Sequence, residues 1–150
     1  MALTYEVKEY STFGKCVCIE NDVMELYVTV DRGPRIIKLN LVGKENMMFN
    51  DDALSIYHDE PNLQDMFGKG ARWNICGGHR FWVSPEKHPE TYYPDNDPVA
   101  YTVDHNVFTF YAPKQVFTGW QETMIVTVDE TEVKASVKHV LTNMSDRTQT

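Results

Sequence analysis

The sequence predicts an all-β protein built as an antiparallel β-sandwich, and three observations lead to this prediction. Apolar and polar residues alternate with a period of two over much of the chain. Clusters of Asp, Asn, Gly and Pro, which are typical of turns, separate the alternating runs. No window shows a helical period longer than two turns. Together these patterns are typical of antiparallel sheets that bury one face and expose the other.

Each predicted strand is one alternating run. The clearest is 23–30, where every even-numbered residue is apolar, and 35–41 repeats the alternation after a turn at 31–34. Two polar stretches, 104–106 and 129–131, are short enough to be hairpin loops. The other predicted strands share the same alternation: 4–9, 15–20, 99–103, 106–111, 122–128 and 132–141. A chain of 150 residues with these strands is expected to form a single β-sandwich domain, residues 1–150.

The middle of the chain differs from its two ends. Helices are expected to be minor, because the best candidate, 51–59, is short and follows a polar start. The segment 58–98 is rich in glycine, proline, tryptophan and tyrosine, and is expected to form long structured loops around short strands. Long loops held by a rigid sheet often carry function. A functional site is therefore expected in this segment.

Charge and composition exclude two classes of protein. Fourteen Lys and Arg against 22 Asp and Glu give a formal net charge of −8 at pH 7. Such a chain repels phosphate backbones, so nucleic acid is not an expected partner. Hydrophobic residues make up 42% of the chain and charged residues 24%. These values are typical of folded domains and exclude a disordered chain.

Membrane and secretory segments are not expected either. Charged residues follow the N-terminal methionine before an apolar stretch forms, and no run approaches the length of a membrane span. Cys16, Cys18 and Cys76 are odd in number and fit neither a zinc spacing nor a disulfide framework. A cytoplasmic, reducing location is therefore expected. Cys16 and Cys18 lie two apart in an extended run, so they should share one face and behave as small apolar side chains.

Side chains that can carry chemistry concentrate in 72–86. This stretch combines apolar rings, guanidinium donors, an imidazole, a carboxylate and a glycine pair that lets a ligand approach the backbone. The mixture suits a sugar, whose C–H face stacks on an aromatic ring and whose hydroxyl rim needs charged or amide partners. The candidate site residues are Arg72, Asn74, His79, Arg80, Trp82 and Glu86.

Structural roles remain open for several of these residues. Trp73 and Trp82 also fit the core of a sandwich. Arg72, Arg80 and Glu86 also fit ordinary ion pairs with residues of opposite charge.

Most other histidines are expected to have no chemical role. His58, His88 and His105 lie in stretches predicted to be polar loops, so they are expected to be solvated. His139 alternates in phase with Val137 and other apolar residues, which predicts an inward-facing, hydrogen-bonded side chain.

Metal and nucleotide sites lack their usual motifs. His-x-His, His-Glu-x-x-His and Cys-x-x-Cys are absent from the sequence, so a dedicated metal site is not expected, although loop imidazoles can still converge in space. The sequence also lacks a Gly-x-Ser-x-Gly elbow and a glycine-rich phosphate loop. The sequence therefore indicates no cofactor.

One stretch resembles a known family. The residues Gly-Gly-His-Arg-Phe-Trp-Val-Ser-Pro-Glu at 77–86, followed by Thr-Tyr-Tyr-Pro-Asp-Asn at 91–96, resemble a divergent branch of the galactose mutarotase-like superfamily, which includes the aldose 1-epimerases. Shorter stretches at 33–37, 46–49 and 140–143 are similar to the opening and late strands of that family. The specific part of the resemblance is the Gly-Gly-His-Arg run.

The resemblance implies a fold and a chemistry. It implies a β-supersandwich, of which 1–150 would be the N-terminal half, and a sugar bound on a concave sheet with a His as general acid and a Glu as general base. Two features depart from the family: Cys76 stands where its motif has a His, and no His follows Thr142-Asn143.

Three hypotheses follow. The first is a carbohydrate-binding protein whose Arg, His and Trp cluster holds a sugar or sugar derivative. The second is an active aldose mutarotase or epimerase, an isomerase in which His79 and Glu86 serve as the acid and base pair. The third is a structural half-domain. In each case an open half-sandwich is expected to form a homo-oligomer through its exposed sheet edges.

Overall fold

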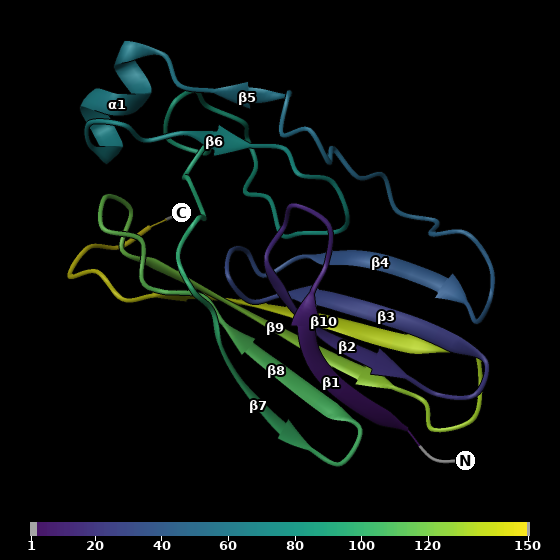
Figure 1. The fold of residues 1–150 in the computed structure, drawn as a ribbon. Coiled ribbons are helices and arrows are strands. Elements are labelled where there is room, and N and C mark those ends of the chain that lie inside the picture. Colours follow the sequence, from purple (N-terminus) through teal and green to yellow (C-terminus); the bar gives the residue numbers. More distant parts are fainter. Residues whose placement is uncertain (1–2, 150) are drawn as a thin grey trace.

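The computed structural model describes residues 3–149, and within them the chain forms an antiparallel β-sandwich (Figure 1). The first sheet has the order β1-β2-β3-β4, with β1 (Thr4–Glu9), β2 (Lys15–Glu20), β3 (Met24–Thr29) and β4 (Ile36–Leu41). The second has the order β10-β9-β8-β7, with β7 (Ala100–Asp104), β8 (Val107–Tyr111), β9 (Trp120–Val128) and β10 (Ala135–Asn143). The predicted all-β antiparallel sandwich is confirmed.

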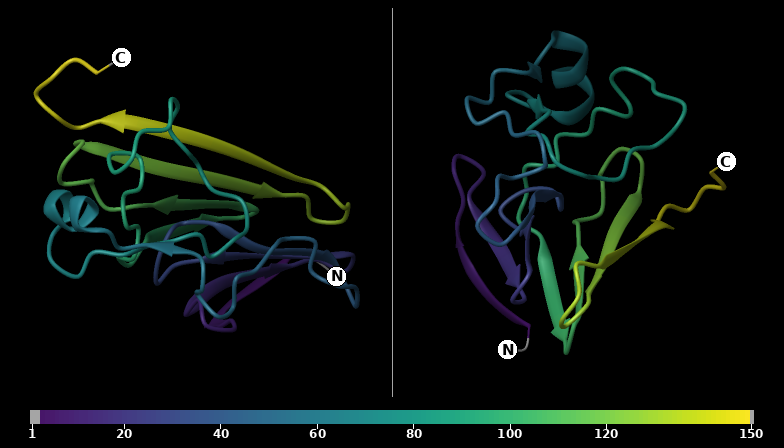
Figure 2. Two further views of the ribbon diagram at one scale, coloured as in Figure 1. Left: turned by 90° about the horizontal axis from the view of Figure 1, so that it is seen from above. Right: turned by 90° about the vertical axis from the view of Figure 1, so that its right-hand side faces the viewer.

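A smaller layer lies across one end of the sandwich. It contains a two-stranded sheet of β5 (Tyr57–His58) and β6 (Trp73–Asn74), and the helix α1 (Pro61–Phe67). The two large sheets lie close together at one end and separate toward the end that carries α1 (Figure 2, right). No helix in residues 3–149 is long and apolar enough to cross a membrane.

The main core lies between the two large sheets. The period-two alternation directs one set of apolar side chains inward from each sheet, and Tyr5 of β1 meets Phe108 of β8 edge to face at 5.4 Å between ring centroids. The buried residues of this core are Val17, Ile19, Met24, Leu26, Val28, Val30, Ile36, Val99, Phe108, Phe110, Met124, Val126 and Val128.

A second, smaller core covers the other face of the first sheet. Cys16 and Cys18 share this face, as predicted, and pack with Phe13, Ile37 and Cys76. All three cysteines are free thiols. Burial raises the pKa of Cys16 to about 12 and that of Cys18 to about 11. Strand β2 is therefore buried on both faces, as its four consecutive buried residues show.

Helices are minor, as expected, but the best helix candidate, 51–59, does not form the one short helix of the described residues. The Asp51 carboxylate accepts hydrogen bonds from the Ile56 amide (2.8 Å) and the Ser55 hydroxyl (2.9 Å), and Leu54 has a positive φ of 51°. These contacts close a turn in place of a helix. The helix instead begins at Pro61, where a proline fits because the first turn leaves its backbone nitrogen unpaired.

The strand predictions are correct to within a few residues. The largest difference is at β10, which begins at Ala135 and not at 132. The Asp129 carboxylate accepts hydrogen bonds from the backbone amides of Thr131 and Glu132, and the Asn21 side chain donates to the carbonyl of Glu132. These bonds extend the predicted hairpin loop at the expense of the strand.

Two glycines fix the middle segment against the first sheet. His79 pairs with Ile36 in an isolated antiparallel bridge, with N···O distances of 2.9 Å in both directions. A Cβ at Gly77 would lie 2.0 Å from the Phe49 carbonyl oxygen, and one at Gly78 would lie 2.2 Å from the Ile36 carbonyl oxygen. Both glycines also have positive φ. Only glycine fits so close to the neighbouring backbone, and the bridge places His79 and its neighbours beside the start of β4.

Candidate functional site

An open pocket of about 330 Å³ lies beside the glycine pair, within the segment where a site is predicted. Its lining residues come from the 49–50 bridge, β6 and the loops that follow β6. They are Phe49, Trp73, Ile75, Gly77, Gly78, Arg80, Trp82, Glu86 and Tyr92. The volume is within the range typical of small-molecule sites. We refer to this set as the aromatic pocket.

Three rings form the wall of the aromatic pocket. Trp73 and Trp82 lie 5.6 Å apart between ring centroids at 79°, and Tyr92 lies 5.0 Å from Trp73 and 5.2 Å from Trp82. All three pairs meet edge to face, a favourable arrangement for aromatic rings. The rings therefore support one another, and Trp73 is buried while Trp82 and Tyr92 are half-buried.

Buried polar donors in the pocket lining lack hydrogen-bond partners within the described chain. They are the indole nitrogens of Trp73 and Trp82 and one terminal nitrogen of Arg80, Nη1. The Arg80 guanidinium lies 4.7 Å from the ring centroid of Trp82 and 5.5 Å from that of Trp73. Buried donors are nearly always paired in folded proteins, so these three nitrogens have hydrogen-bonding capacity that the described chain leaves unused.

A cluster of charged residues lies behind the pocket. Arg35 is fully buried and donates to both carboxylate oxygens of Asp95, at 2.8 and 2.6 Å. Arg80 Nη1 lies 3.6 Å from the same carboxylate. Burial alone would raise the pKa of Asp95, but the two guanidinium groups hold it below its ordinary value. Burial lowers the pKa of Arg80.

Glu122 of β9 completes this charged cluster. Burial raises the pKa of its carboxyl to about 7, and the negative charge of Asp95 raises it further, against the opposing effect of the two arginines. Glu122, Asp95, Arg80 and Trp82 all line a narrow pocket that adjoins the aromatic pocket through Arg80 and Trp82. The sequence prediction did not include Asp95 or Glu122 among the site residues.

Three of the six predicted site residues line the aromatic pocket: Arg80, Trp82 and Glu86. The Tyr92 hydroxyl donates a hydrogen bond to the Glu86 carboxylate, which raises the pKa of Tyr92. This contact holds an acceptor at the pocket rim. Tyr92 was not predicted as a site residue, although it lies in the Thr-Tyr-Tyr-Pro-Asp-Asn stretch at 91–96 that contributes to the family resemblance.

The other three predicted residues lie elsewhere. Asn74 is buried in β6, opposite Tyr57 of β5, and is not among the lining residues. Arg72 is exposed and stacks on the Tyr57 ring, with its guanidinium carbon 3.5 Å from the ring centroid. His79 is exposed and also lies outside the lining.

His79 instead meets a second histidine. Its Nε2 lies 2.8 Å from Nε2 of His139, sixty residues later, and the two ring centroids are 5.0 Å apart. His139 pairs in register with the buried Met124 and so faces inward, which agrees with the predicted inward-facing, hydrogen-bonded role. Burial, and next the neighbouring His79, lower the pKa of His139.

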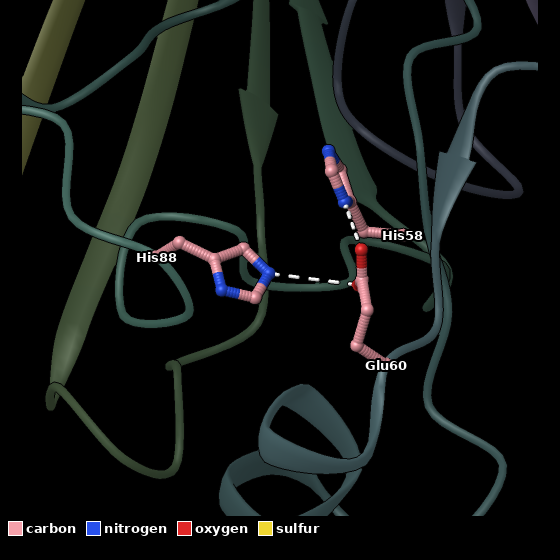
Figure 3. Close-up of side chains that lie close together, drawn as sticks. All are labelled: His58, Glu60 and His88. Carbon is pink, nitrogen blue, oxygen red and sulfur yellow. Dashed lines mark hydrogen bonds and ion pairs between the residues drawn. The ribbon is translucent and has the colours of Figure 1, made fainter.

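The predicted solvated-loop role is wrong for His58, which belongs to β5 and is half-buried. His88 does lie in an exposed turn, and the Glu60 carboxylate lies between its ring and that of His58 (Figure 3). His105 does match the prediction, because it is highly exposed and contacts its neighbour Asp104 in a turn.

Comparison with known proteins assigns no family. The chain matches no protein-family model, no curated protein and no solved structure. A functional assignment therefore rests on the chemistry of the described residues.

Proposed function

We propose that the protein binds a carbohydrate, a sugar or sugar derivative, in the aromatic pocket. The single observation that carries this proposal is the combination, in one lining, of three mutually packed aromatic rings and buried donors without hydrogen-bond partners in the described chain. A sugar ring offers an apolar C–H face for the rings and several hydroxyl oxygens that accept hydrogen bonds.

The charges of the pocket fit the same ligand. Arg80 supplies a cationic donor within the lining, and Glu86, oriented by Tyr92, supplies an acceptor at the rim. Hydroxyl groups both donate and accept, so they can use both side chains at once. The lining contains one cationic side chain, Arg80, and one anionic side chain, Glu86, so their formal charges balance. This balance favours a neutral sugar over a phosphate ligand.

The resemblance to the galactose mutarotase-like superfamily supports a sugar as the ligand. It gives weaker support for catalysis in this pocket. The side chain of Cys76, which stands where the family's motif has a His, is buried in the small core with Cys16 and Phe13. His79 does not line the pocket that contains Glu86. Binding is therefore the function that we propose first.

One observation favours an isomerase of the aldose 1-epimerase kind as a second candidate. His79 and His139 place two imidazole nitrogens 2.8 Å apart, so one ring must hold the proton that the other lacks. Such a pair can both donate and accept protons, as anomer interconversion requires. Anomer-exchange rates measured by NMR with several aldoses distinguish the two candidates, because only the isomerase accelerates exchange and loses this activity in His139→Ala.

Replacing Trp82 tests the binding site directly. We expect Trp82→Ala to weaken binding of the best ligand from a panel of aldoses by about tenfold, because stacking on an aromatic ring contributes on the order of 1 kcal/mol. Affinity is measured by calorimetry, and folding by the denaturant midpoint. Tyr111→Ala, which removes an exposed ring on β8 outside the lining, serves as the control. A lower midpoint with unchanged affinity in Trp82→Ala would assign this residue to the core alone.

A further inference from the structure

A second cluster of side chains lies beside the aromatic pocket, where β5, α1 and the loop carrying Glu86 and Tyr92 meet. His58 ends β5, Glu60 immediately precedes α1, and His88 comes from the loop. One nitrogen from each imidazole and one carboxylate oxygen all lie within 4.8 Å of one another. His88, which follows His58 by 30 positions in the sequence, thus comes close to His58 and Glu60 in the fold (Figure 3).

The distances suit a small divalent cation. Glu60 Oε1 lies 2.7 Å from His58 Nδ1, and Glu60 Oε2 lies 3.6 Å from His88 Nε2. A zinc ion binds nitrogen and oxygen ligands at about 2.0–2.2 Å, so its ligand atoms are about 3–3.5 Å apart. The observed distances lie on either side of this range, and small side-chain rotations are enough to reach it.

Neighbouring side chains hold the two imidazoles in place. Tyr92 contacts both of them, with centroid distances of 4.8 Å to His58 and 5.1 Å to His88, and Trp73 lies 5.6 Å from His58. The Asn62 amide lies 3.2 Å from His88 Nδ1, so the other nitrogen of this ring is the one that faces Glu60. Outer contacts of this kind orient the ligands of metal sites.

The type of ligand selects the type of metal. Two imidazoles and one carboxylate favour zinc and its neighbours among the transition metals, whereas calcium and magnesium prefer oxygen ligands alone. All three side chains are partly exposed, which leaves room for solvent to complete the coordination. The thiols, which are the strongest zinc ligands of the chain, are all buried in the small core and cannot compete.

We propose that His58, Glu60 and His88 bind a divalent transition-metal ion, with zinc as the best-fitting ion, in an open site completed by solvent. The site is independent of the proposed sugar function, because its ligands do not line the aromatic pocket. A bound ion would join the end of β5 to the loop that carries Glu86 and Tyr92.

Calorimetric titration of the intact chain with zinc chloride tests this proposal. We expect one saturable site per chain with micromolar affinity, and at least tenfold weaker binding in Glu60→Gln and in His88→Ala. Both side chains are solvent-accessible, so these variants should keep the fold, and circular dichroism checks that they do. Cobalt(II) in place of zinc gives a second readout, since its visible absorption reports direct coordination.

Two variants control for other imidazoles. His105→Ala removes an exposed histidine that has a carboxylate partner, Asp104, and should bind zinc like the unmodified chain. His79→Ala disrupts the His79–His139 pair and should also leave binding unchanged. No saturable zinc uptake at tens of micromolar would overturn the proposal, as would equal uptake in Glu60→Gln and His88→Ala or a loss confined to His79→Ala.

Discussion

Arg35 is fully buried although it carries a permanent charge, and its contacts explain how the fold accommodates it. Nη1 donates to the Ile75 carbonyl at 2.8 Å, and Nη2 donates to the Asp95 carboxylate. Arg80 contributes a second cation to the same carboxylate. A buried charge is tolerated only when it is paired and hydrogen-bonded. The charge of the nearby Glu122 is the one that changes near neutral pH, because its pKa is about 7.

Glu122 should therefore make stability depend on pH. An acid with a higher pKa in the folded chain than in the unfolded chain binds its proton more tightly when folded. The contribution to stability is complete below pH 4.5, declines as the pH rises to about 7, and then stays constant. The shift corresponds to at most roughly 3 kcal/mol, less what solvent screening removes.

We expect Glu122→Gln to abolish this decline. Free energies of unfolding from urea titrations at pH 5 and pH 8 measure the effect. Glu45→Gln, at an exposed glutamate in the turn after β4, should retain the decline of the unmodified chain. Parallel pH profiles for Glu122→Gln and the unmodified chain would refute the assignment.

At the scale of elements, the strands could be predicted because their signal is local. The alternation in 23–30 or 122–128 depends only on residues within one run, and these strands form where expected. The helix at 61–67 was missed because a single buried residue, Leu63, gives it almost no periodicity. Its one local signal is Pro61 at the start.

The candidate site was predictable only in part, for the same reason. Arg80, Trp82 and Glu86 fall in one stretch of sequence, and they line one pocket. Contacts between distant segments are invisible to local patterns. The pairing of Arg35 with Asp95 spans sixty residues, and that of His79 with His139 spans sixty as well. The contact between His58 and His88 likewise depends on how the loop after β6 packs against β5.

The glycine pair offers a test of how the site is fixed to the sheet. Gly78 and Gly43 have the same φ, +75°, but only Gly78 has backbone in the way of a Cβ, whereas nothing lies within 4 Å at Gly43. Both Gly→Ala changes incur the cost of a positive φ, on the order of 1 kcal/mol. We expect Gly78→Ala to destabilise the fold by about 2 kcal/mol more than Gly43→Ala. Denaturant midpoints measure the difference. Equal midpoints would show that the backbone at the bridge to Ile36 can move to accommodate a Cβ at little cost in stability.

At the scale of the molecule, the sandwich is less well covered along one side. Strands β4 and β10 are edge strands of the two sheets in the described chain. Between them lies an apolar groove of about 250 Å³, lined by residues of β3, β4, the following turn and the start of β10. On β10, Val137 and Leu141 remain partly exposed. Exposed apolar edges of this kind favour pairing with another chain.

We predict that a second copy of the chain covers this side. Antiparallel pairing of β10 with β10 of another copy is self-complementary and gives a closed two-fold dimer. Light scattering over a concentration series should show a dimer or larger oligomer at micromolar concentration, and Val137→Asp should shift it toward monomer. Val116→Asp, at a more exposed valine that does not belong to β10, should not. A monomeric unmodified chain at micromolar concentration would contradict this prediction.

The small core also determines when the thiols of the chain can react with oxidants. Cys76 is distant in sequence from Cys16 and Cys18, yet all three share one buried cluster. The raised pKa values of Cys16 and Cys18 add a chemical barrier to the steric one, since the thiolate is the reactive form. Modification of these sulfurs thus requires the first sheet and the 75–79 segment to separate. Oxidation of the three thiols would therefore accumulate only in molecules in which the small core has unfolded at least once. The oxidised fraction would then measure how many molecules have unfolded in this way.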